Sequence, residues 1–89
     1  MGMIAERIRQ KLTEGLSPTQ LTIEDDSARH AGHSGATPGG ESHFNVTVES
    51  AAFAGLNPVQ RQRLVHRLLA EELAGPVHAL SLSLSTPPA

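Results

Sequence analysis

The sequence of 89 residues contains no cysteine, and its aromatic residues are few. Tryptophan and tyrosine are absent, which leaves only Phe44 and Phe53. Without cysteine the chain can form no disulfide, thiolate nucleophile or metal site with sulfur ligands of its own. A metal would therefore have to bind through histidine or carboxylate side chains. Two phenylalanines also provide no stacking platform for single-stranded nucleic acid or sugars.

Positive charge and long apolar runs are scarce as well. Seven Lys and Arg residues against nine Asp and Glu give a formal net charge of -2. A broad basic surface for a polyanion such as DNA is therefore not expected. No run approaches the length of about 18 apolar residues that a membrane helix needs, and the N-terminus lacks the layout of a signal peptide. We expect a cytoplasmic protein with no membrane partner, folded as a single domain over residues 1–89.

Two stretches have the apolar periodicity of amphipathic helices. The buried stripe of the first comprises Ile4, Ile8 and Leu12. Gly15 and Pro18 then end that helix. The second, of about four turns, starts at Asn57-Pro58 and ends before Gly75-Pro76, because these pairs are helix-start and helix-stop signals. Its stripe comprises Leu64, Val65, Leu68, Leu69 and Leu73.

Three other segments alternate apolar and polar residues, as half-buried strands do. They are residues 20–24, 43–49 and 77–85, with a short helical turn at 51–54. Strands joined by a loop pair antiparallel most simply, whereas a strand-helix-strand unit gives parallel strands. The predicted fold is α+β, in the order α-β-β-α-α-β. It has a three-stranded mixed sheet with helices on one face, a K-homology-like (type II) topology. A long flexible loop at about 27–41 and a tail at 86–89 complete it.

This topology gathers four of the five histidines at one rim of the sheet. They are His30, His33, His43 and His78. The alternation of side chains predicts that His43 points away from the helices and His78 toward them. Two imidazoles suit iron or zinc but do not close a metal site, so a partner would have to complete it. The alternative is that these are solvated histidines of a loop and of strand ends.

Five segments together resemble the BolA family. They are Asp25-Asp26-Ser27 with His30, Glu41-Ser42-His43-Phe44, Ser50 with Phe53-Ala54-Gly55, Arg61-Gln62-Arg63-Leu64-Val65, and Val77-His78-Ala79-Leu80. The resemblance covers the chain from about Ile4 to Leu84. One departure is Gln62, since the family usually has Arg-His-Arg where this chain reads Arg61-Gln62-Arg63.

The resemblance implies a partnership with a monothiol glutaredoxin around a shared two-iron, two-sulfur cluster. In that arrangement the glutaredoxin and its glutathione supply thiolates, and the BolA-like protein supplies a C-terminal histidine and a loop ligand. His78 matches the first, and His30 or, three residues on, His33 matches the second. The role would be cluster trafficking or iron homeostasis. The chain alone is expected to hold no cluster and to be a monomer or weak dimer.

An alternative is a DNA-binding transcriptional regulator, since residues Phe53–Leu73 look like a helix-turn-helix. Arg61, Arg63 and Arg67 would then contact DNA, although Arg67 has Glu71 four residues on as an ion-pair partner and Arg61 suits a structural role. An enzyme is not expected. Asp25, Ser27 and His30 are close in sequence, but a loop offers them no fixed catalytic geometry.

Overall fold

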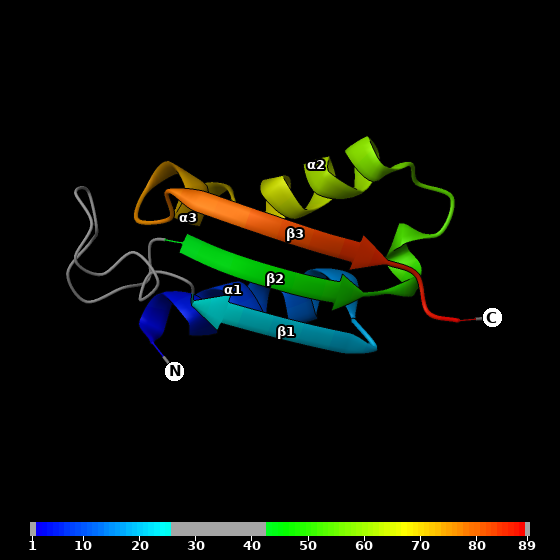
Figure 1. Cartoon of the computed structure of the whole chain (residues 1–89), viewed down its shortest axis with the longest axis horizontal. Helices are drawn as coiled ribbons and strands as arrows, with labels where there is room; N and C mark the ends of the chain where they lie inside the picture. The colour runs from blue at the N-terminus through cyan, green and yellow to red at the C-terminus, as the bar shows by residue number, and fades with distance from the viewer. Residues whose placement is uncertain (1, 26–42, 89) are drawn as a thin grey trace.

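The computed structural model describes residues 2–25 and 43–88, which form a three-stranded sheet with helices on one face (Figure 1). The elements are α1 (Met3–Leu16), β1 (Gln20–Asp25), β2 (His43–Glu49), the 3-10 turn η2 (Ala51–Phe53), α2 (Pro58–Leu68), α3 (Ala70–Ala74) and β3 (Ala79–Ser85). The α+β class and the order of the elements are as predicted. The predicted loop at about 27–41 lies outside the described residues.

The sheet has the strand order β1-β2-β3, so β2 is central. β1 pairs antiparallel with β2, with Leu21 opposite Val48. β2 pairs parallel with β3, from His43 opposite Ala79 to Glu49 opposite Ser85. Figure 1 shows β2 and β3 running in one direction and β1 in the other. The predicted mixed sheet is therefore confirmed.

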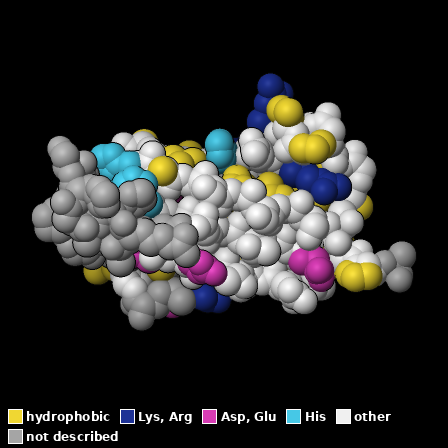
Figure 2. Space-filling model, viewed as in Figure 1, with side chains coloured by type: hydrophobic (Ala, Val, Ile, Leu, Met, Phe, Trp, Pro, Cys, Tyr) yellow, Lys and Arg dark blue, Asp and Glu magenta, His cyan; other side chains and the backbone are white. Residues whose placement is uncertain are grey.

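The hydrophobic core lies between the sheet and the helices. Phe44, Val46 and Val48 of β2 are buried against the stripe of α1. The other buried apolar residues are Ala5, Ile8, Leu12, Leu16, Phe53, Val65, Leu69 and Val77. The opposite face of the sheet carries short polar side chains such as Thr47 and Ser83, and Figure 2 shows it almost free of hydrophobic atoms. The sheet is thus covered on one side only.

Buried Ser50 joins the end of β2 to the end of α1. Its hydroxyl donates to the backbone oxygen of Leu16 at 2.6 Å and accepts from the backbone N–H of Ala52 at 3.1 Å. The Ser50 N–H donates in turn to the Ser85 oxygen at 2.9 Å. One small polar residue therefore satisfies three backbone groups where α1, β2, β3 and η2 meet.

The second predicted helix is not continuous. Leu69 interrupts it with φ -104° and ψ 20°, so that α2 ends at Leu68 and α3 begins at Ala70. The prediction of one uninterrupted helix from Asn57 to Leu73 was therefore wrong. Its start is confirmed, since Asn57 and Gln60 form a reciprocal capping box with hydrogen bonds of 2.8 and 2.9 Å.

Beyond Leu69, the side chain of Glu72 is fully buried against α1. Its Oε1 accepts a hydrogen bond from Lys11 Nζ at 3.0 Å, and its Oε2 lies 2.8 Å from Arg7 Nη2. Burial alone would raise the pKa of Glu72. The Lys11 hydrogen bond, a backbone hydrogen bond and the charges of Lys11 and Arg7 outweigh it and hold the pKa below its usual range. The ion pairs therefore attach α3 to α1.

The substitution Glu72→Gln keeps the shape of the side chain but removes its charge. We expect the free energy of unfolding at pH 7, measured by urea denaturation, to fall by about 1–3 kcal/mol. Because the folded-state pKa is lowered, the stabilisation is complete above the unfolded-state pKa and is lost as the pH falls through the folded-state value. The difference between wild type and variant should therefore shrink in acid.

Glu71→Gln is the matched control, because Glu71 lies 3.9 Å from Arg7 and 3.6 Å from Lys11 but its side chain is 79% exposed. An exposed pair of this kind contributes little, so stability should not change. Equal losses in the two variants, or a Glu72→Gln effect that grows in acid, would contradict this role of Glu72.

Candidate functional site

The end of β1 and the beginnings of β2 and β3 meet at one rim of the sheet. Asp25, the last residue of β1, lies opposite Phe44, and His43, the first residue of β2, lies opposite Ala79, the first of β3. This meeting follows from the antiparallel and parallel pairings of β2. Figure 2 shows histidine side chains gathered at this end of the sheet, which we call the histidine rim.

His43 and His78 lie next to each other at the histidine rim. Their ring centroids are 6.4 Å apart and the ring planes differ by 17°, a stacked arrangement. The expectation that the two rings point to opposite faces was wrong. β3 begins only at Ala79, so the alternation of side chains in a strand does not fix His78. His78 is instead exposed beside half-buried His43.

The backbone on both sides of His78 is anchored. The preceding residue, Val77, is buried, and its N–H donates to the backbone oxygen of Glu72 at 2.9 Å. The following residue, Ala79, is paired with His43 in the sheet. His78 is therefore an exposed side chain on a fixed backbone. Such a side chain needs little further ordering to bind a ligand.

The described residues bring together His78 and His43, whereas His30 and His33 lie outside them. His30 and His33 thus stay predictions. Within 2–25 and 43–88 there is no group of three or more His, Cys, Asp or Glu side chains that could hold a metal. The sequence placed His43 at the same rim as His78 but on the opposite face of the sheet, and it did not name His43 as a ligand candidate.

Two imidazoles at an exposed rim fit a metal centre that a partner completes. Neutral imidazole is an accepted ligand of iron and of zinc, and the chain supplies no thiolate. The two imidazoles are too few for a site that the described part of the chain closes alone.

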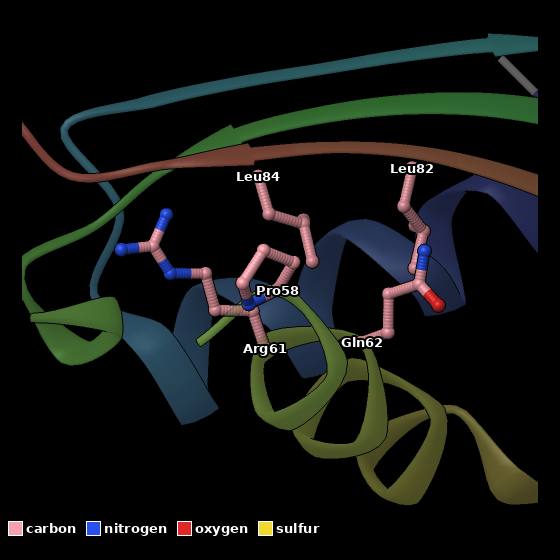
Figure 3. Close-up of a pocket in the computed structure, with 5 residues that line it drawn as sticks. All are labelled: Pro58, Arg61, Gln62, Leu82 and Leu84. Carbon is pink, nitrogen blue, oxygen red and sulfur yellow. The ribbon is translucent and has the colours of Figure 1, made fainter. Parts of the chain in front are cut away.

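The three arginines of the DNA-binding alternative do not form one surface. Arg61 is half-buried, and its Nε donates to the backbone oxygen of Leu56 at 3.0 Å. It lines a groove of about 180 Å³ between α2 and β3, into which Leu82 and Leu84 point (Figure 3). Arg63 and Arg67 are exposed and line a different groove. Arg61 therefore has the structural role that the sequence indicated.

The expected ion pair of Arg67 with Glu71 is not formed. Glu71 lies instead within 4.0 Å of Arg7 and Lys11 on α1. The interruption at Leu69 explains the difference, because the spacing of four residues no longer falls on one regular helix.

Among the helices described here, none is long and apolar enough to cross a membrane.

Comparison with known proteins places these features in a family. The model of the family described as BolA-like protein matches residues 12–89. Human BolA-like protein 1 is 51% identical over 87 residues, which are 98% of this chain and 61% of that protein. A Vibrio cholerae protein named DNA-binding transcriptional regulator BolA is 44% identical over 94% of this chain and 76% of its own length.

A solved structure agrees with the sequence comparison. The BolA domain of SufE1 from Arabidopsis thaliana superposes with a TM-score of 0.86 at 45% identity, covering 98% of this chain and 95% of that one. The chain spans about three fifths of the length of the first curated relatives it matches. The matched family model and these relatives show that the chain belongs to the BolA-like protein family.

Proposed function

We propose that this chain is a BolA-like partner of a monothiol glutaredoxin and shares a two-iron, two-sulfur cluster with it. The observation that carries the proposal is the pair of neighbouring histidines, His43 and His78, at an exposed rim. Membership of the BolA-like family supports it, as does the absence of cysteine, which leaves sulfur ligands to the partner. The cellular role would be cluster trafficking or iron homeostasis.

In this proposal the glutaredoxin contributes a cysteine and its bound glutathione a second thiolate. His78 is the fixed histidine ligand on this side, because buried Val77 and sheet residue Ala79 flank it. His30 or His33 is proposed as the second ligand, and His43 is a competitor since its ring lies beside that of His78. Ligation by imidazole in place of thiolate raises the reduction potential of a cluster.

The role is that of a binding protein and not of an enzyme. The carboxylate of Glu72, whose pKa is lowered, pairs with Lys11 and Arg7 inside the fold. That arrangement stabilises the packing of two helices and does not present the Glu72 carboxylate to a substrate. The chemistry of the protein is therefore proposed to be metal ligation alone.

The purified chain should be colourless and monomeric or weakly dimeric. Two imidazoles without a thiolate retain iron too weakly to hold a cluster through purification. Absorbance between 300 and 700 nm and size-exclusion chromatography measure this directly. A stable red-brown protein, purified without glutaredoxin or glutathione, would contradict the proposal.

The histidines should contribute unequally to the shared cluster. We expect His78→Ala to abolish the histidine signature in the visible circular dichroism spectrum of the mixed complex, because its fixed backbone makes it the stronger ligand. His30→Ala should be partly rescued by His33, three residues on. Titration of each variant with cluster-loaded glutaredoxin, with and without His43→Ala, identifies the second ligand.

Exposed His66 of α2 provides the matched control for that titration. His66→Ala should give the wild-type spectrum, and the complex of the two apo-proteins should form with every variant. A wild-type spectrum from His78→Ala would remove that residue from the site and overturn this assignment of the rim.

DNA binding is the second candidate function, favoured by the name of the Vibrio cholerae relative. Of the three candidate arginines only Arg63 and Arg67 are exposed, since Arg61 is half-buried and donates to the backbone oxygen of Leu56. Two phosphate contacts on a chain with a formal charge of -2 support weak, salt-sensitive binding. A sequence-specific complex that survives physiological salt and is lost without these two arginines would put this function first.

A further inference from the structure

The outer side of α2 carries a groove that the cluster proposal does not use. Its volume is about 360 Å³, and its lining residues are Leu56, Gln60, Arg63, Leu64 and Arg67. Leu56 lies just before α2, whereas Gln60 is three and four residues from Arg63 and Leu64, and Arg67 is one turn after Arg63, so these four share one face of the helix. We call this the α2 groove. It lies at the lower end of the range of about 300–1,000 Å³ that binding pockets occupy.

The α2 groove is flanked by two cations that no acidic side chain of residues 2–25 or 43–88 neutralises. Arg63 and Arg67 are exposed and one helical turn apart. The ion pairs among the described residues connect α1 with α3, or lie within α1, and leave both of these arginines out. Because Glu71 turns toward α1, the acid that could have neutralised Arg67 is directed elsewhere.

Apolar side chains form part of the lining of the α2 groove and lie beside it. Leu56 and Leu64 are only half-buried, and Val59, one turn before Arg63, is 55% exposed. Gln60 lies between them with its Oε1 held by the Asn57 N–H, so this part of the lining is fixed. Figure 2 shows hydrophobic side chains next to Lys or Arg over α2, whereas the acidic side chains of that view lie lower, over the sheet.

We propose that the α2 groove docks an acidic peptide segment of a partner protein through an apolar anchor residue. The leucines would receive the anchor, and Arg63 and Arg67 would form charge-assisted hydrogen bonds with flanking carboxylates. A phosphodiester backbone fits less well. It would use the two cations but leave half-buried Leu56 and Leu64 and exposed Val59 without a partner. Proteins that bind DNA tightly also contact about 6–10 phosphates.

The test is an NMR titration of the ¹⁵N-labelled chain alone with a blocked eight-residue peptide that carries six acidic residues around two leucines. We expect saturable shifts at Leu56, Gln60 and Leu64. Replacing the two leucines of the peptide with serine, or its acids with lysine, should weaken binding at least tenfold. Shifts elsewhere, no saturation, or equal binding of the serine peptide would overturn the proposal.

Protein variants separate the contribution of the arginine charges to peptide binding from that of the apolar side chains. Arg63→Ala and Arg67→Ala should each weaken binding several-fold, as should Val59→Ser. The charge-matched control is Arg9→Ala on α1, whose guanidinium lies 4.0 Å from Glu6, and it should bind as wild type. The amide spectrum of each variant reports whether it is folded. If Arg9→Ala weakened peptide binding equally, the net charge of the chain would explain the loss, and a docking site on α2 would be contradicted.

A DNA duplex provides the remaining comparison. If the duplex displaces the peptide at lower concentration than unlabelled peptide does, at physiological salt, the surface is a nucleic-acid interface and the peptide proposal fails. Because glutaredoxin and cluster are absent from the titration, a negative result here does not bear on the proposal for the histidine rim. Failure of the cluster experiments, conversely, leaves the α2 groove untouched.

Discussion

The parallel pairing of β2 with β3 is the constraint on which the candidate site depends. Parallel neighbours require a crossover, here η2, α2 and α3, which returns the chain to the end of the sheet where β2 began. The crossover therefore places His43 and His78, 35 residues apart in sequence, at the same rim. No local motif could bring them together.

The crossover also determines where charge remains exposed. Its interruption at Leu69 directs Glu71 and Glu72 toward Arg7 and Lys11 of α1. That contact fixes α3, and through the bond of Val77 to Glu72 it fixes the backbone just before His78. The same contact removes the acids from the neighbourhood of Arg63 and Arg67. Buried Glu72 thus holds α3 and the backbone before His78 in place, and the turn of exposed Glu71 toward α1 leaves the α2 groove cationic.

Most of the fold could be predicted because its signals are local. The apolar stripe of α1, the alternation of Phe44, Val46 and Val48, and the capping box of Asn57 each specify an element by period or by a cap. Chain connectivity then determined the strand order. The resemblance of five short segments to one family agreed with this result, and the comparisons confirmed the family.

The parts that could not be predicted depend on contacts between distant segments. A charged residue within an apolar stripe suggests exposure, but Glu72 is buried because Lys11, 61 positions away, donates to it. The predicted orientation of His78 was wrong for another reason, because β3 begins at Ala79, two residues after the predicted start at Val77. Strand ends are set by pairing, which a single sequence does not show.

The shared cluster is proposed to lie at the histidine rim, and paramagnetic broadening tests this most directly. Cluster-loaded glutaredoxin is added to the ¹⁵N-labelled chain, and each amide signal is compared with that in the apo-complex. Broadening should be strongest around His43, His78 and Ala79 and weak at the start of α2, toward the other end of the sheet (Figure 1). Broadening centred on α2, with the signals of the rim unchanged, would contradict the account.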